Sequence, residues 1–579
     1  MDACPHENLD SCLPEVVKSG SKADVSGGNQ NPPCFLNLLL ALQHLFVQAS
    51  LLVLVVGVLK QHLPPEAGGR EELLSSMLFY SCLSTLVQSF LGTCLPVIHT
   101  PSLATLVPAL VLATHIISDS NCRGSCEENE EENPTQTNPL KELQGMTLVA
   151  GLIQLILGAT GLGGVVLRHC GPLVIAPLLC MLGFSMYREA ALLCSDNWAV
   201  TALVVILVVG MSQHLRYFLF PACLRLPRLP VCRMLSVLLS LLCVLAVCAT
   251  LESLDYLRLH SVSELLPALG PRNMSHQVPT DRNVSSSSAL WFSLPLAAET
   301  GLPMLSARCI AAGVIAGFSS SVSSVGVYVL TARLQGAPPL PEAACNRGLG
   351  AQGLCSVMAG LVGAPLGLCC SVPNCCVFGL SQAGSRRTVQ LAAILGLTLG
   401  LSPRMTQAFT SVPMAVYGAV LMVTHTIAVA MGVMYFQFTH IDSGRNIFNI
   451  GFAVFMSLVL PRWFRIQSDF IDTGMASIDV LLQSLLISPV LLVGILAFLL
   501  DNTVSGSLAE RGLVPGENWT RGRTGLKSEP GAGQRATDYH QEVALVYDSP
   551  YLLTRLWDLP VFRTCPLSAF RLPDNGEVL

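Results

Sequence analysis

The chain has 579 residues, of which 51% are hydrophobic and only 12% are charged. Because soluble globular proteins carry about 25% charged residues, this composition is typical of a polytopic membrane protein. The net charge of -5 is small and the sequence has no basic patch or nucleic-acid-binding motif, so no DNA or RNA partner is expected.

A helix needs about 20 apolar residues to cross a bilayer. Apolar segments that approach this length occur in two sets of seven. The first set lies at 38–59, 73–95, 103–117, 146–167, 172–186, 198–211 and 235–251. The second set lies at 310–330, 353–363, 364–382, 391–401, 412–434, 447–460 and 480–500. We therefore predict an all-α polytopic membrane protein with about 14 transmembrane segments arranged as two seven-span repeats.

The polar segments predict the domain organisation. We expect a cytoplasmic tail at 1–34, a first seven-span repeat at 35–252, an extracellular loop at 253–305, a second seven-span repeat at 306–501 and a cytoplasmic tail at 502–579. The first tail has no charged segment followed by a short apolar one, so no cleavable secretory signal is expected.

Orientation follows from the basic loops, because cytoplasmic loops are enriched in Lys and Arg. The arginines of two short loops are Arg216, Arg225, Arg228 and Arg233 in one, and Arg386 and Arg387 in the other. With fourteen spans, both loops lie on the side of the N-terminus, and the loop at 253–305 lies outside. That loop contains glycosylation sequons at Asn273 and Asn283, which agrees with this orientation and with a plasma-membrane location.

Most of the 22 cysteines lie in apolar segments, where a thiol usually behaves as a small hydrophobic group. Cys122 and Cys126 differ because they lie in a polar loop, where a disulfide is an option if the loop is extracellular. No group of residues has metal-ligand spacing, so no metal ligands are assigned.

The segment 364–382 reads APLGLCCSVPNCCVFGLSQ and is broken by prolines, among them Pro373 before Asn374. Backbone groups freed by such a break are tolerated at bilayer depth only against protein or a watery cavity. The segment 95–103 carries two prolines at the corresponding place in the first half. Inverted repeats place their site between two such broken helices, so this pair predicts a pocket near the membrane midplane.

Helix starts at 102–105 and 374–378 could present free N–H groups to an anion or a carbonyl oxygen, although each proline could also only kink a packed helix. Two further polar groups are candidates. Gln43 and His44 lie in the first apolar segment, either as functional groups or as a satisfied interhelical hydrogen bond. The eighth segment has serines at 319, 320, 321, 323 and 324, which could line the pocket or mark close helix packing.

The sequence has no P-loop, no pair of nucleophile and base, and no arginine-rich voltage sensor. It therefore favours a secondary transporter over a channel or a receptor, and it gives no reason to expect an enzyme.

Several motifs resemble the animal branch of the nucleobase-ascorbate transporter family, solute carrier family 23. They are LALQHLFV at 40–47, HCGPLVIAP at 169–177, TARLQGAPPLPEAACNRGL at 331–349, SVPNCCVFGLSQAGSRR at 371–387, IDSGRNIFNIGF at 441–452 and LDNTVSGSLAERGL at 500–513. Within that branch, the chain looks most like the third vertebrate subgroup. The resemblance implies two inverted seven-span repeats and short strands in spans three and ten. It also implies a core domain (spans 1–4 and 8–11), a gate domain (spans 5–7 and 12–14), elevator-like movement of the core, and a homodimer formed through the gate.

The resemblance also assigns a substrate site. Its members would be Leu103, Ser323, Val327, Ser371, Val372, Pro373 and Asn374, braced by Gln43 and His44. The family's Glu-Ser-Ile-Gly-Asp pattern aligns with residues 323–327, so both carboxylates are replaced here. Leu103 stands where the family has an aromatic ring, and Cys376 stands where the signature after Asn374 has glycine.

The expected function is sodium-dependent transport of a nucleobase, hypoxanthine or xanthine. The alternatives are sodium-dependent transport of L-ascorbate, a facilitative pathway, and a transport-inactive sensor or assembly partner. Sodium is expected only as a coupling ion, and no other cofactor is expected.

Overall fold

The structure is a computed structural model. It describes residues 33–63, 69–124, 138–218, 229–254, 291–293, 301–467, 470–512, 541 and 543–547, without the side chains of 119–124. The expected glycosylation sites Asn273 and Asn283 lie outside the described residues, as do Cys126 and the side chain of Cys122. Those expectations therefore stay predictions.

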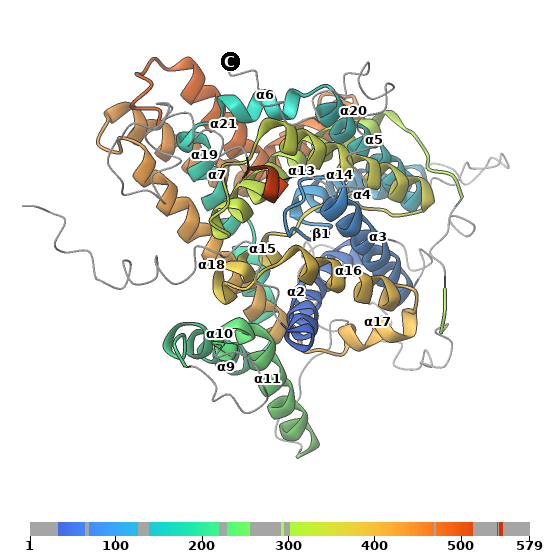
Figure 1. Ribbon diagram of the computed structural model, residues 1–579. Helices are drawn as coiled ribbons and strands as arrows, with labels where there is room; N and C mark the ends of the chain where they lie inside the picture. Colours follow the sequence, from blue (N-terminus) through green and yellow to red (C-terminus); the bar gives the residue numbers. More distant parts are fainter. Residues whose placement is uncertain are drawn as a thin grey trace, which may run out of the picture.

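The first half of the chain is helical apart from one very short strand (Figure 1). Its elements are α2 (Cys34–Gln61), α3 (Arg70–Phe90), β1 (His99–Thr100), α4 (Leu103–Gly124), α5 (Pro139–Ala159), α6 (Leu162–His169), α7 (Pro172–Phe184), α8 (Tyr187–Cys194), α9 (Trp198–Val209), the π-helix η2 (Gly210–His214), α10 (Val231–Met234) and α11 (Ser236–Ser253).

The second half has the same character. Its elements are α13 (Ala307–Leu334), α14 (Glu342–Val362), β2 (Cys369–Cys370), α15 (Val372–Ser381), α16 (Arg386–Gly400), α17 (Pro403–Thr410), α18 (Met414–Tyr435), the 3-10 helix η4 (Phe436–Phe438), α19 (Gly444–Ile466), α20 (Ala476–Ile487) and α21 (Pro489–Thr503).

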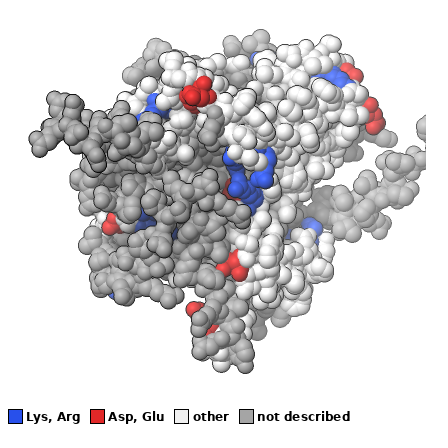
Figure 2. All heavy atoms as spheres, turned by 180° about the vertical axis from the view of Figure 1, so that it is seen from behind, with Lys and Arg blue, Asp and Glu red and all other residues white. Residues whose placement is uncertain are grey.

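Many of these helices are built to cross a membrane. In the described part of the chain, eight helices are long and apolar enough to do so, or nine if α20 and α21, bent by 79°, form one span. Among the described residues seen from behind, most are uncharged and drawn white, with charged groups confined to small clusters, as expected for a lipid-facing exterior (Figure 2). The chain is thus a multi-pass membrane protein, and the count of fourteen spans stays a prediction.

Some of the predicted boundaries were wrong. α14 begins at Glu342 rather than at 353. The prediction missed its first turns because they carry polar side chains, Asn346 and Arg347, which are nevertheless buried. The predicted segment 146–167 is divided into α5 and α6 at Gly161, whose φ of +79° lies in the left-handed region that favours glycine.

α5 and α14 lie in close contact, and small residues make this approach feasible. A Cβ on Gly151 would lie 2.5 Å from the backbone nitrogen of Val357, and one on Gly360 would lie 2.8 Å from that of Leu148. Small residues commonly permit such contacts between membrane helices. Both helices also hold the segment before β2, because Gln154 of α5 and Gln352 of α14 donate to the carbonyl oxygen of Leu368.

The strands β1 and β2 pair antiparallel, with His99 opposite Cys370 and Thr100 opposite Cys369. Both strands are buried, and each precedes a helix, the 22-residue α4 or the 10-residue α15. β1 lies inside the molecule among the helices of both halves (Figure 1). The prolines at 101 and 373 are thus found where the chain changes from strand to helix, and Pro96 lies in the segment before β1.

A short piece of the C-terminal tail returns to the helices, where residues 543–547 form a helical turn, drawn in red in Figure 1. Tyr547 is fully buried, and its hydroxyl donates to the carbonyl oxygen of Pro338 at 2.7 Å. Arg347 Nη2 donates to the carbonyl oxygen of Tyr547 at 2.5 Å. The tail is therefore anchored beside the loop between α13 and α14.

Candidate functional site

The site is built on the strand pair, because that pair fixes where α4 and α15 begin. The Ser371 amide donates to the carbonyl oxygen of Ile98 at 2.8 Å, which continues the pairing by one residue. The Cys370 amide donates to Ser324 Oγ at 3.1 Å, which fastens β2 to α13. Segments from both halves thus meet at the first turn of α15.

That first turn carries four of the predicted substrate residues. Ser371 is the N-cap, and its hydroxyl accepts from the backbone N–H of Asn374 at 3.5 Å. Val372 and Pro373 follow in the first turn, where the missing N–H of proline costs nothing. Since the cap is supplied by the chain itself, the expected row of free N–H groups is reduced. The Val372 amide makes no hydrogen bond with another described residue.

Asn374 connects this turn to the first helix. Its side-chain Nδ2 donates to Ser371 Oγ at 2.9 Å, and its Oδ1 lies 3.4 Å from His44 Nδ1. The His44 ring also packs against Phe378, with centroids 4.6 Å apart. All of these groups are buried. The structure therefore brings together His44, Ser371 and Asn374 as predicted partners.

The tautomer of His44 determines which ring nitrogen can donate a hydrogen bond and which can accept one. A bond to the carbonyl oxygen of Asn374 requires Nδ1 to carry the proton, which leaves Nε2 as an acceptor. His44 Nε2 is buried and has no hydrogen-bond partner among the described residues. The pair thus has one unused acceptor.

Gln43 makes interhelical hydrogen bonds, which was one of the two alternatives expected for it. Its Nε2 donates to the carbonyl oxygen of Met234 at 3.2 Å, and its Oε1 accepts from the Leu238 amide at 3.0 Å. These partners belong to α10 and α11, so Gln43 fastens α2 to those helices and makes no hydrogen bond to the predicted substrate residues.

The serines of α13 differ in their hydrogen-bond partners. Ser320 bonds Gln154 of α5, Ser321 donates to the Gly317 carbonyl oxygen at 2.7 Å, and Ser324 holds β2. Ser323 is 3% exposed and makes no hydrogen bond with a described residue. Val327, one turn further on, is fully buried. Ser319 and Ser323 are thus the α13 serines whose hydroxyls make no hydrogen bond with a described residue, and Ser323 is the one among the predicted substrate residues.

The remaining wall is apolar. Leu103 is half-buried at the start of α4, against the hydrophobic core. Gly326 of α13 faces α7 so closely that a Cβ there would lie 2.8 Å from Leu182 Cδ1. The site thus has aliphatic surface at the predicted stacking position and close contact between α13 and α7.

The strand pair also holds a polar network that sequence reasoning missed. Gln48 donates to Ser81 Oγ at 2.7 Å and to the His99 carbonyl oxygen at 3.3 Å. Ser84 Oγ lies 2.7 Å from His99 Nδ1, and Thr85 Oγ1 accepts from the His99 amide at 2.9 Å. A signal existed, because Gln48 lies one helical turn after His44 and the three hydroxyls share one face of α3.

Charged groups of the described part lie elsewhere. Glu142 pairs with Arg308 at 2.8 Å, and Asp501 pairs with Arg445 at 3.0 Å. Asp479 accepts from the amide and hydroxyl of Thr473. The described residues contain no group of three His, Cys, Asp or Glu side chains that could hold a metal ion. The site therefore works with neutral donors and acceptors.

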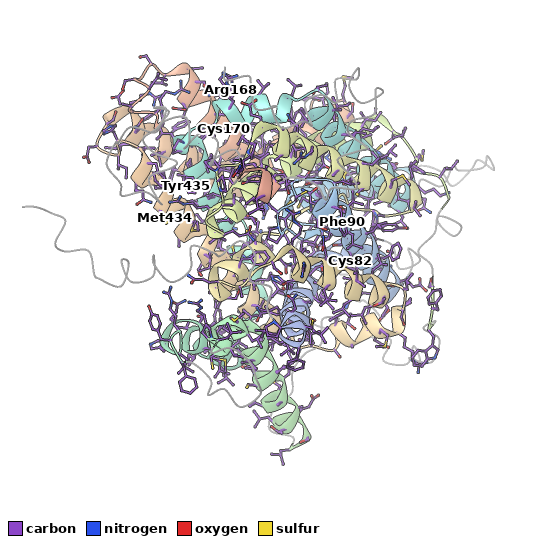
Figure 3. The ribbon with its side chains drawn as sticks, viewed as in Figure 1. Cys82, Phe90, Arg168, Cys170, Met434 and Tyr435 are labelled. Carbon is purple, nitrogen blue, oxygen red and sulfur yellow. The ribbon has the colours of Figure 1, made fainter. Side chains whose placement is uncertain are left out.

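A cavity of about 350 Å³ opens at one end of α13, between that helix and α6, α7 and α18. Arg168, Cys170, Arg333 and Tyr435 are among the residues that line it. Figure 3 labels Arg168, Cys170 and Tyr435 in this part of the molecule. Because the cavity-lining residues Val329 and Arg333 lie two and six residues after Val327, the cavity approaches the site along α13.

The architecture and the broken helices define a multi-pass membrane transporter, and comparison with known proteins agrees. Residues 36–466 match a model described as the permease family. The chain is 40% identical to solute carrier family 23 member 3 of Mus musculus over 83% of this chain and 78% of that protein. It is 32% identical to solute carrier family 23 member 1 of Mus musculus (88% and 84%) and 27% identical to nucleobase-ascorbate transporter 1 of Arabidopsis thaliana (84% and 90%).

The chain therefore belongs to the nucleobase-ascorbate transporter family, solute carrier family 23. The resemblance predicted from the motifs is confirmed, including the likeness to the third vertebrate subgroup. A solved structure of the murine solute carrier 26 family member A9 anion transporter is 12% identical, with a TM-score of 0.43, over 83% of this chain and 73% of that one.

Proposed function

We propose that the chain is a secondary active transporter of a neutral nucleobase, hypoxanthine or xanthine, coupled to sodium. The proposal rests on the unused acceptor of His44 beside Asn374 at the start of α15. Ring N–H groups of an oxopurine can donate to such an acceptor, while its carbonyl oxygens can accept from the Val372 amide and the Ser323 hydroxyl. Pro373 keeps the first turn in place, and Leu103 and Val327 supply apolar surface to the ring.

The neutrality of the site supports a nucleobase over L-ascorbate, which is an anion at neutral pH. An anion would have to be held by the Val372 amide and the dipole of α15 without a cationic side chain. L-ascorbate stays the alternative substrate, because a relative is named a nucleobase-ascorbate transporter.

Sodium coupling is supported by family membership rather than by the ligand set. Sodium is a hard cation that prefers oxygen ligands, and hydroxyl and carbonyl oxygens are the oxygens available at 323–327. Serine and valine at 323 and 327 therefore favour two further alternatives, a facilitative pathway and a transport-inactive sensor or assembly partner.

We further propose an elevator-like movement, in which spans 1–4 and 8–11 slide against spans 5–7 and 12–14. The close approach of Gly326 to Leu182 supports this, because a surface of small and aliphatic groups has few bonds to break. The bonds from Gln43 to Met234 and Leu238 would then hold one position. The same proposal includes a homodimer through the gate domain, a plasma-membrane location and cytoplasmic tails at 1–34 and 502–579.

Uptake in cells tests these alternatives. Labelled hypoxanthine, xanthine, uracil and ascorbate are supplied with and without sodium to cells that express the chain at their surface. Sodium-dependent uptake of one base supports the proposal, uptake without sodium favours the facilitator, and no uptake despite surface expression favours the sensor. Asn374→Ala should abolish any uptake, and Asn449→Ala is the control, because Asn449 is a buried asparagine of α19.

A further inference from the structure

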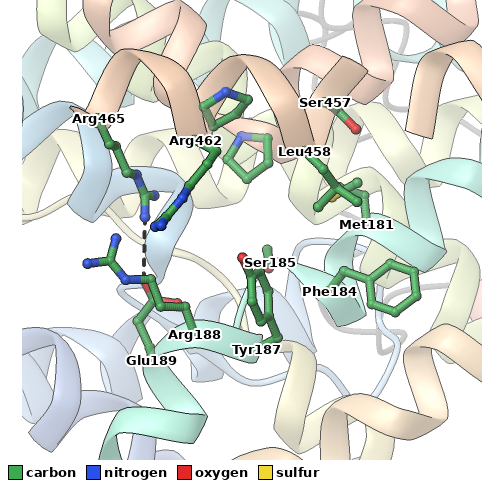
Figure 4. Close-up of a pocket in the computed structure, with 12 residues that line it drawn as sticks. Met181, Phe184, Ser185, Tyr187, Arg188, Glu189, Ser457, Leu458, Arg462 and Arg465 are labelled. Atoms are coloured by element: carbon green, nitrogen blue, oxygen red, sulfur yellow. Dashed lines mark ion pairs between the residues drawn. The ribbon is translucent and has the colours of Figure 1, made fainter. Parts of the chain in front are cut away.

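Three arginines meet in a gap between α8 and α19, away from the proposed substrate site (Figure 4). Arg462 and Arg465 descend from α19, and Arg188 rises from α8 beside Tyr187 and Glu189. The gap holds a cavity of about 50 Å³ that is lined by all five residues. These arginines are not explained by transport chemistry at α15.

The charges in this gap do not balance. Arg465 Nη1 lies 3.7 Å from Glu189 Oε1, which is an ion pair but too long for a hydrogen bond. Arg188 and Arg462 have no ion pair or hydrogen bond with any residue that the structure describes. Glu189 Oε2 is likewise buried without a partner. Three guanidinium groups therefore share one carboxylate, and an excess of two positive charges remains in a half-buried space.

Such an excess is unfavourable without a counter-ion, because like charges repel most where water is partly excluded. Arginine presents its N–H donors in a planar fork that matches the oxygens of a phosphate group. The arrangement therefore favours a bound oxyanion of this geometry over a simple monatomic anion.

The surroundings indicate where that oxyanion comes from. Exposed apolar side chains flank the gap at the end of α7 and on α19, with Phe184 at 38%, Leu458 at 37% and Phe455 at 66% exposure. Tyr187 lines the cavity and Trp463 follows Arg462 in α19, and both are exposed aromatic side chains of the kind that is enriched where a membrane meets water. A ligand bound in this gap would contact charged protein groups at one end and a long apolar protein surface beside them.

We propose that Arg188, Arg462 and Arg465 bind the phosphate group of a membrane phospholipid whose acyl chains lie along Phe184 and the exposed face of α19. Because the arginines come from two helices, the lipid joins α8 to α19. With the N-terminus in the cytoplasm, this lipid belongs to the outer leaflet. The proposal also gives a reason for Arg462 and Arg465 on the side where basic residues are otherwise depleted.

The test uses the purified full chain in detergent, after removal of bound lipid, with thermal unfolding as the readout. The probes are dioleoyl phosphatidylglycerol, dioleoylglycerol, which lacks the phosphate, and inorganic phosphate. The variant is R188Q/R462Q, which removes two charges that have no partner in the described structure and leaves the Arg465–Glu189 pair intact. Arg404→Gln is the control, since Arg404 lies over the Trp291 ring at 4.3 Å, away from the gap.

We expect phosphatidylglycerol to raise the unfolding temperature of the wild type and of Arg404→Gln. For R188Q/R462Q, the lipid concentration that gives half of this effect should rise about tenfold or more, the size expected for lost charge-assisted hydrogen bonds. An equal effect of dioleoylglycerol, or an unchanged response of R188Q/R462Q, overturns the proposal. An arginine-dependent response to inorganic phosphate at matched concentration would assign the site to a soluble oxyanion and overturn the lipid as its source.

Discussion

Replacing Asn374 by alanine tests the hydrogen-bonded core of the site. The substitution removes the 2.9 Å bond to Ser371 Oγ and the 3.4 Å contact with His44 Nδ1. Ser371 keeps its bond from the backbone N–H of residue 374, so the cap survives. His44 would have no hydrogen-bond partner among the described residues, because its Nε2 already lacks one.

The magnitude follows from these two losses. A stranded buried polar group costs about 1–3 kcal/mol and a lost neutral hydrogen bond about 0.5–1.5 kcal/mol, so Asn374→Ala should lower stability by roughly 1.5–4.5 kcal/mol. Asn449→Ala provides the matched control. Both side-chain polar atoms of Asn449 are buried without a partner in the described structure, so their removal should leave stability unchanged or raise it.

Thermal unfolding of the purified variants in one detergent measures both effects, and a double-mutant cycle isolates the pair. In a His44→Leu background, Asn374→Ala should cost at least about 0.5 kcal/mol less than in the wild type. If Asn374→Ala is as stable as Asn449→Ala, or if the two site variants are additive, then the contact between His44 and Asn374 does not support the site.

Two further predictions concern the carboxylates and the tail. Ser323→Glu combined with Val327→Asp places carboxylates at buried positions of α13, so the unfolding temperature of this variant should rise with sodium but not with potassium. The absence of any sodium effect would mean that these positions do not form the ion site. Tyr547→Phe should increase cleavage of the tail by limited proteolysis, because it removes the bond to the Pro338 carbonyl oxygen, worth about 1 kcal/mol. Leu545→Ala, at a side chain 75% exposed, is its control and should be cleaved like the wild type.

Hydropathy located the helices well, because lipid requires nearly continuous apolar segments. Hydropathy failed where polar side chains are buried inside the protein. Asn346 accepts from the Gly164 amide at 2.6 Å, and Arg347 donates to the Gly92 and Tyr547 carbonyl oxygens. Such partners compensate polar groups inside the protein, and they cannot be seen from a hydropathy profile. The start of α14 was therefore missed.

The site was only partly predictable for a related reason. Proline next to Asn374 shows where a helix breaks, since proline removes a backbone donor locally. The partner of Asn374 is His44, 330 residues away, and spacing carries no information about that pairing. The neighbouring Gln43 faces α10 and α11 instead, because adjacent residues on a helix point about 100° apart. A shared Gln-His motif thus has two structural roles.

The serines of α13 give the most informative case. Helical periodicity places Ser320 and Ser324 on one face and Ser323 on another, but it does not say which neighbours those faces meet. The structure shows that Ser320 and Ser324 bond α5 and β2, while Ser323 has no bond to a described residue. Helical spacing alone therefore cannot separate the serines that hold the neighbouring backbone from Ser323, which the motif resemblance aligns with a glutamate.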